Sequence, residues 1–176
     1  MQCYNNLINC TQLIASHNLG PKGETTSMNE DEWMKLDNQV CFSLYACSRE
    51  ITKLYRPVLS ELGLTYTQYV TLLSLWEQDK VTMKELGARL LLDSGTLTPL
   101  LKKLEGMNLI TRIRDKADER NLVIQLTDDG RELKKRVADV PKRVYGSLDI
   151  APEEFHAVHK QVRDLLGKIE ASQQPT

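Results

Sequence analysis

The sequence has little that would suit a membrane protein or a secreted scaffold. No apolar run approaches the roughly 18 residues that a membrane span requires, and the chain does not open with the basic-then-apolar pattern of a secretory signal. No cysteine follows Cys47, whereas disulfide-stapled secreted proteins spread their bridges along the chain. We therefore expect a cytoplasmic protein with free thiols and no membrane contact.

The cysteines also lack the spacing of a zinc site. Neither Cys3 and Cys10 nor Cys41 and Cys47 follow the pattern of two cysteines separated by two to four residues. We expect no bound metal and no cofactor.

An excess charge of one sign is missing as well. The chain has 23 Lys and Arg against 24 Asp and Glu, a net charge of -1. This excludes a uniformly basic nucleic-acid coat, but it permits a DNA-binding protein whose positive charge lies on one face. With 176 residues, 41% hydrophobic and 27% charged, the chain is long enough for one globular domain with a real core.

The first 27 residues differ from the rest. They are rich in Asn, Ser and Thr, carry only Lys22 and Glu24 as charges, and end in the breaker Gly20-Pro21-Lys22-Gly23. Poorly packed segments gather at chain ends. We interpret residues 1–27 as a disordered extension, Met28 as the natural start, and residues 28–176 as the domain.

Helical periodicity begins after this extension. The first long helix has an apolar stripe that recurs every three or four residues, formed by Val40, Leu44, Cys47, Ile51, Leu54 and Val58. We expect Pro57 to interrupt or restart this helix. Two capping boxes, at Thr65-x-x-Gln68 and Thr82-x-x-Glu85, predict the starts of the next two helices.

The rest of the chain adds three helices and a hairpin. In the helix after Thr82 we expect Leu86, Leu90 and Leu91 to face inward, and a following helix covers 94–106. Runs at 109–114 and 120–126 predict a β-hairpin, and a helix from 128 to 140 should stop at Pro141. The last helix, 152–171, has an apolar face with no sheet to cover. We therefore expect a homodimer through the terminal helices, in 28–62 and 128–172.

The order of helix, tight turn, second helix and hairpin over 64–127 predicts a winged helix-turn-helix, in a mainly α fold with a β-hairpin wing. Such a unit places its second helix in a DNA major groove and its wing against the adjacent minor groove or backbone. Nine basic and six acidic residues fall within 80–120, so this segment is +3 and the remainder -4. The charge distribution favours a DNA reader.

The second helix opens with small side chains that can donate hydrogen bonds, which suits close approach to phosphates and base edges. The alternative is ordinary helix capping, which accounts for Asp93 and Ser94 but not for so little apolar bulk. The candidate DNA-binding residues of this helix are Ser94, Gly95, Thr96, Thr98, Lys102 and Lys103.

The hairpin contributes Arg112, Arg114 and Arg120. Each alone would suit a solvated face. Arg120 differs because Asp118 lies two residues before it, where a carboxylate can orient the guanidinium toward a narrow minor groove. We include Asp118 with the three arginines among the DNA-binding candidates.

Two cysteines on the first long helix differ by helical position. Cys47 lies in the apolar stripe between Leu44 and Ile51, as expected of a small buried side chain. Cys41 begins a polar and aromatic stripe with Tyr45, Ser48, Thr52 and Tyr55. A phenol can donate a hydrogen bond to a thiolate, which is the form that attacks a peroxide. On spacing alone, an interior cysteine among packing tyrosines is an equal alternative.

Taken together, these motifs resemble the MarR family of dimeric winged-helix regulators over residues 34–170. Asp118-Glu119-Arg120 is similar to the family's wing signature, and the run 92–105 to its recognition helix. The runs 36–46 and 64–69 resemble one thiol-sensing branch, the organic hydroperoxide resistance regulators. The resemblance implies that Cys41 is the peroxide-reactive sensor, that Tyr55 and Tyr66 reach it from the other subunit, and that Tyr45 lies nearby.

Some members of that branch have a second, resolving cysteine in the C-terminal half, which this chain lacks. The resemblance therefore implies the one-cysteine type, in which a low-molecular-weight thiol or over-oxidation follows the sulfenic acid. The expected function is a non-enzymatic repressor that binds a pseudo-palindromic operator when reduced and dissociates when organic hydroperoxide oxidises Cys41. Alternatives are a MarR-type repressor gated by an aromatic ligand, a thiol peroxidase and an architectural DNA binder.

Overall fold

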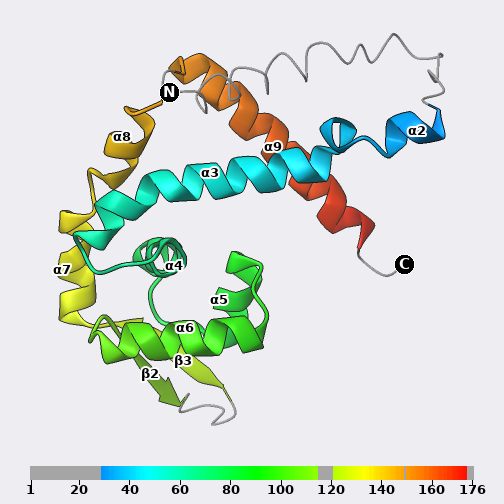
Figure 1. Ribbon diagram of the computed structural model, residues 1–176. Helices are drawn as coiled ribbons and strands as arrows, with labels where there is room; N and C mark the ends of the chain where they lie inside the picture. The colour runs from blue at the N-terminus through cyan, green and yellow to red at the C-terminus, as the bar shows by residue number, and fades with distance from the viewer. Residues whose placement is uncertain (1–28, 115–120, 149, 174–176) are drawn as a thin grey trace. The chain divides into compact units, whose positions relative to one another are not determined.

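The computed structural model describes residues 29–114, 121–148 and 150–173. Its contacts divide the chain into two units, Met1–Leu54 and Tyr55–Thr176. The first unit contains α2 (Glu30–Trp33), the short 3-10 helix η2 (Leu36–Asn38) and most of α3 (Val40–Ser60). The second contains the end of α3 and every later element (Figure 1).

The later elements are four helices and three strands up to α7, followed by two more helices. In chain order they are α4 (Tyr66–Glu77), β1 (Val81–Thr82), α5 (Met83–Leu90), α6 (Ser94–Gly106), β2 (Ile110–Arg114), β3 (Leu122–Leu126), α7 (Asp128–Arg136), α8 (Val140–Tyr145) and α9 (Pro152–Ser172). The predicted winged helix-turn-helix is confirmed, with α5 and α6 as its helices and β2–β3 as its wing.

Helix starts follow the side chains that cap them. Both predicted capping boxes are present, with Thr65 and Gln68 at α4 and Thr82 and Glu85 at α5. Thr127 caps α7 by accepting from the Gly130 amide at 3.0 Å. Each cap satisfies amides that would otherwise lack a partner at a helix N-terminus.

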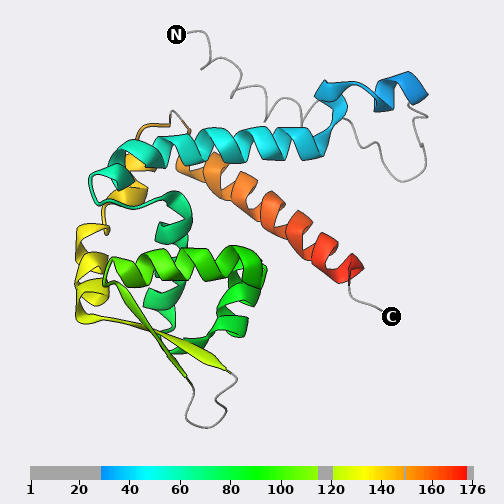
Figure 2. The same ribbon diagram turned by 60° about the horizontal axis from the view of Figure 1, so that its bottom comes forward.

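The winged part is built around one apolar core. Leu72, Leu75, Leu101, Leu104 and Ile124 are completely buried. The three strands form an antiparallel sheet in the order β1-β3-β2. Figures 1 and 2 show the hairpin running alongside α6. The sheet and the core therefore hold the second helix and the wing in one rigid piece.

Four features differ from the sequence prediction. Pro57 lies inside a continuous α3, with its ring exposed; it removes one N–H bond without ending the helix. Pro141 does not end a helix, because α7 already stops at Arg136 and Pro141 lies in the first turn of α8, where no amide donor is needed. The two-residue strand β1 was not predicted. Leu91 faces outward, 61% exposed, because the chain turns there with a φ of 54°.

Candidate nucleic-acid interface and thiol site

The N-terminal turn of α6 is exposed and internally ordered. Asp93 caps it, accepting from both the amide and the hydroxyl of Thr96 at 2.9 Å. These bonds, chiefly the one from the Thr96 amide, hold the pKa of the Asp93 carboxyl below its ordinary value. Ser94, Gly95 and Thr96 are exposed. Capping therefore uses the Asp93 carboxylate and leaves the outer surface of this turn open to a ligand.

The turn before α6 is tight because of Gly87. A Cβ there would lie 3.0 Å from the Leu92 carbonyl oxygen and 3.5 Å from Leu97. Only a very small residue lets α5 approach α6 this closely. Farther along α6, Lys102 and Lys103 are exposed, whereas Thr98 is half-buried and donates to the Ser94 carbonyl at 2.7 Å.

The two wing arginines inside the described residues have different surroundings. Arg112 donates twice to one carboxylate oxygen of Glu105, from Nε at 2.9 Å and from a terminal nitrogen at 2.5 Å. This bond holds the pKa of Glu105 below its ordinary value. Arg114 lies two residue pairs nearer the hairpin tip and is exposed. Arg112 thus ties the wing to α6, while the charge of Arg114 is available outside. Asp118 and Arg120 lie outside the described residues.

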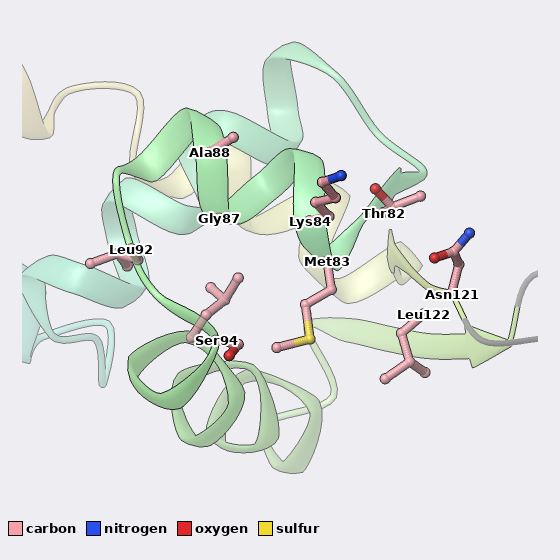
Figure 3. Close-up of a pocket in the computed structure, with 10 residues that line it drawn as sticks. Thr82, Met83, Lys84, Gly87, Ala88, Leu92, Ser94, Asn121 and Leu122 are labelled. Atoms are coloured by element: carbon pink, nitrogen blue, oxygen red, sulfur yellow. The ribbon is translucent and has the colours of Figure 1, made fainter. Parts of the chain in front are cut away.

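A hollow of about 380 Å³ separates the start of β3 from the helix pair. In Figure 3 the side chains of Met83 and Ser94 lie on its helical side, and Leu122 comes from the strand. The lining residues are Thr82, Met83, Lys84, Gly87, Ala88, Leu92, Ser94, Leu97, Asn121 and Leu122. Their mixture of apolar and polar groups is typical of small ligand pockets, and the volume is near their lower limit.

The thiol lies in the other unit. Cys41 is in the first turn of α3 and is exposed, and Cys47 is half-buried rather than buried as expected. Tyr45, one turn after Cys41, is 59% exposed. The guanidinium of Arg49 lies over the Tyr45 ring, 5.4 Å from its centroid. Cys41, Tyr45 and Arg49 share one side of α3, since residues four apart are neighbours on a helix surface.

The tyrosines of the second unit form an aromatic cluster. Tyr55 packs edge-on against Tyr66, with ring centroids 5.0 Å apart. The centroids of Tyr55 and Tyr69 are 5.9 Å apart. Burial first, and then the nearby Tyr145 hydroxyl, hold the pKa of Tyr55 far above its ordinary value. Burial also raises the pKa of Tyr66. Both phenols are protonated near neutral pH, as an unshifted tyrosine also is, and the Tyr55 hydroxyl already interacts with that of Tyr145.

The predicted sensor residues thus fall into two groups. Tyr55 and Tyr66 are brought together in the second unit, whereas Cys41 and Tyr45 belong to the first. Sequence reasoning missed Tyr69, Tyr145 and Arg49. Arg49 had a signal in the sequence, because it follows Cys41 and Tyr45 at the next step of four. Tyr145 had none, because only tertiary packing brings α8 to α3 and α4.

Two negative findings apply to the described residues. Within 29–114, 121–148 and 150–173 no group of His, Cys, Asp and Glu could hold a metal ion. No helix in those same ranges is long and apolar enough to cross a membrane.

Comparison with known proteins identifies the family. A family model described as transcriptional regulator SarA/Rot matches residues 53–137. The organic hydroperoxide resistance transcriptional regulator of Bacillus subtilis strain 168 is 47% identical over 138 residues, which are 78% of this chain and 94% of that protein.

Solved structures agree with this result. Reduced AbfR bound to DNA is 34% identical with a TM-score of 0.72, covering 84% of this chain and all of that one; AbfR is a Staphylococcus epidermidis protein. Overoxidized AbfR bound to DNA is 37% identical with a TM-score of 0.65, covering 79% and 98%. The chain therefore belongs to the MarR family of winged helix-turn-helix transcriptional regulators, in the branch of the organic hydroperoxide resistance regulators.

Proposed function

We propose that the protein is a homodimeric, cytoplasmic repressor that binds a pseudo-palindromic operator when Cys41 is reduced and releases it when organic hydroperoxide oxidises Cys41. The observation that carries this proposal is the exposed Cys41 in the first turn of α3, with Tyr45 on the same side of the helix, in a chain of this family. An exposed thiol can meet a peroxide.

The DNA contacts follow from the exposed surface of α6 and the wing. We assign base and phosphate contacts to the small residues at the start of α6, and phosphate contacts to its lysines and to Arg114. Arg112 positions the wing through Glu105. The full set is Ser94, Gly95, Thr96, Thr98, Lys102, Lys103, Arg112, Arg114, Asp118 and Arg120.

In the proposed sensor, Tyr55 and Tyr66 of one subunit donate hydrogen bonds to the Cys41 thiolate of the other. The packing of Tyr55 against Tyr66, with ring centroids 5.0 Å apart, supports this role because it brings the two side chains together. The thiolate attacks the terminal oxygen of the hydroperoxide and the O–O bond breaks. A Cys41 sulfenic acid forms, and the alkoxide leaves as an alcohol after taking a proton from water. The thiolate acceptor is then gone. Once a bulkier group replaces it, the tyrosine contacts break and the recognition helices move to a spacing that no longer matches the half-sites.

The fate of the sulfenic acid decides whether DNA is released. AbfR was solved bound to DNA in its overoxidized form, which favours a bulkier product as the releasing form here. We propose a mixed disulfide: a low-molecular-weight thiol displaces the sulfenic oxygen as water, and its sulfur bonds to Cys41.

A gel-shift experiment tests the proposal. Wild-type protein bound to DNA from upstream of its own gene should dissociate when cumene hydroperoxide and a small thiol are added, and intact mass should show the thiol adduct. Cys41→Ser protein should stay bound, and Cys47→Ser protein, the matched control, should respond like the wild type. Release of the Cys41→Ser protein by hydroperoxide would refute the sensor assignment.

A second candidate function is ligand-gated repression, favoured by the hollow between the helix pair and β3. An aromatic acid bound there would push the start of β3 away from the helices. Release of operator by salicylate-like compounds from Cys41→Ser protein would establish it. A thiol peroxidase would instead consume hydroperoxide over many turnovers, and an architectural binder would leave no footprint confined to one operator.

A further inference from the structure

One cation lies on the same side of α3 as the proposed sensor thiol. Arg49 follows Cys41 by eight residues on α3, about 12 Å along the helix axis. Long side chains on a helix lean back toward its N-terminus, and the Arg49 guanidinium does so, lying over the Tyr45 ring. The Cβ atom of Tyr45 is in turn only about 5–6 Å from that of Cys41. The guanidinium of Arg49 therefore lies toward the N-terminus of α3, in the direction of Cys41.

This cation has no acidic partner in the part of the chain that the structure describes. The adjacent carboxylate, Glu50, pairs instead with Lys53 at 2.6 Å, and the ion pairs formed by the described residues do not include Arg49. A guanidinium held over an aromatic face keeps its N–H donors free at its edges. Arg49 is thus oriented and able to accept an anion.

We propose that Arg49 recognises a carboxylate on the small molecule that reacts at Cys41, and so selects anionic reactants for this site. The inference rests on the proposed function, which makes Cys41 the reacting group. In a cysteine-derived thiol the carboxylate is three bonds from the sulfur, so one molecule can place its sulfur at Cys41 and its carboxylate toward the guanidinium over Tyr45.

The covalent step is the second one in the sensor cycle. The thiolate of the small molecule attacks the sulfur of the Cys41 sulfenic acid, an S–S bond forms, the S–O bond breaks, and the oxygen leaves as water after taking a proton. The sulfenic sulfur is reduced and the thiol sulfur is oxidised. Arg49 takes no part in this electron transfer; it raises the local concentration of reactants with a carboxylate.

The first experiment measures capping of the sulfenic acid by thiols of different charge. Protein oxidised with cumene hydroperoxide is mixed with N-acetylcysteine, uncharged mercaptoethanol or cationic cysteamine, and the adduct at Cys41 is followed by peptide mass. In Arg49→Gln protein, capping by N-acetylcysteine should slow about threefold to fivefold, the range that one exposed ion pair supplies. The rate of capping by mercaptoethanol should be unchanged in Arg49→Gln protein, and capping by cysteamine should be faster than in the wild type.

Two variants serve as controls. Lys53→Gln removes an exposed cation one turn farther along α3 that already pairs with Glu50, so all three capping rates should stay at wild-type values. Arg49→Lys keeps the charge and should retain part of the preference, which high salt should remove. An equal slowing of all three thiols would overturn the proposal. So would no change in any of them if the reaction of Cys41 with a carboxylated hydroperoxide is also unchanged.

A second carboxylate source is the hydroperoxide itself. If Arg49→Gln slows the loss of reduced Cys41 with a carboxylated hydroperoxide and not with cumene hydroperoxide, while thiol capping is unchanged, the recognised anion is the oxidant. Selective slowing of either step supports the proposal.

Disulfide exchange separates this inference from the proposed function. Reduced protein is treated with dianionic dithiobis(nitrobenzoate) or uncharged dithiodipyridine, with no peroxide present. Arg49→Gln should slow only the dianionic reagent at Cys41. If it does so in a protein whose Cys41 resists hydroperoxide, anion selection stands and peroxide sensing fails. An equal effect on both reagents would refute anion selection alone.

Discussion

The winged helix-turn-helix and the terminal helices differ in how far one chain buries their apolar side chains. In the winged part Leu86, Leu97, Leu101 and Leu104 are at most 1% exposed. On α9, by contrast, no described residue is buried, and Val162 is 42% exposed. The first half of α3 is similar, because its buried residues begin only at Tyr55.

This difference shows which functions a single chain can support. The reading surface on α6 is held by a core that one subunit completes. The thiol lies on a helix whose apolar side chains, such as Val40 at 63% exposed, still need cover. A dimer would supply it, since exposed apolar stripes of this length mark interaction surfaces. In the proposed function, sensing would therefore be assembled between subunits, whereas each winged helix-turn-helix is already held by its own core.

The largest expected effect comes from breaking the winged core. Gly130 lies where α7 passes the Leu109 carbonyl, and a Cβ there would clash with that backbone oxygen. Neither backbone can easily move, because Thr127 donates its amide to the same carbonyl and Trp76 donates to the Gly130 carbonyl at 2.8 Å. Gly130→Ala should lower the free energy of unfolding by about 2–4 kcal/mol, as measured by urea denaturation.

Gly106 provides the matched control for that substitution. It ends α6 with nothing within 4 Å of the position of a Cβ. Gly106→Ala should therefore leave stability unchanged or raise it by up to about 1 kcal/mol. Equal stabilities for the two variants would show that the approach of α7 to Leu109 is not required.

A change in the terminal helices should separate the subunits and leave the winged part folded. Val162→Glu places a charge in the apolar stripe of α9, and a symmetric dimer would carry it twice. The protein should become monomeric in sedimentation and lose about a hundredfold or more in operator affinity, because the two half-sites are no longer bound by one linked molecule. Amide exchange should show that the winged part keeps its fold. Ala157→Glu, on the other side of α9 and also exposed, should remain dimeric. A dimeric Val162→Glu protein would contradict the assignment of this face.

The sequence predicted the winged part well because its signals are local. Thr65 and Thr82 cap the helices they were expected to cap, α6 spans the expected residues 94–106, and Leu86 on α5 is buried as its spacing predicted. A cap needs only four consecutive residues, and a helical stripe needs only its own spacing. Both are therefore visible in a single sequence.

The sequence missed features that depend on tertiary contact. The strand β1 is two residues long, too short for alternation to appear, and exists because Val81 and Thr82 pair with β3. Tyr145 joins Tyr55 and Tyr66 only through the packing of distant helices. Arg112 looked equivalent to Arg114 because the strand pattern does not reveal that Glu105, seven residues earlier, faces one of them.

The smallest expected effect distinguishes these two arginines on the reading surface. Arg114→Gln removes an exposed charge from each subunit and should reduce the slope of log affinity against log salt by about two, as expected for one lost phosphate contact in each of the two half-sites. Arg112→Gln breaks the pair with Glu105, so it should weaken binding through the position of the wing and leave the slope unchanged. Because Arg112 acts through Glu105, Glu105→Gln should weaken binding similarly, and the double variant should lose no more than either single one. A slope change with Arg112→Gln and none with Arg114→Gln would reverse the two roles.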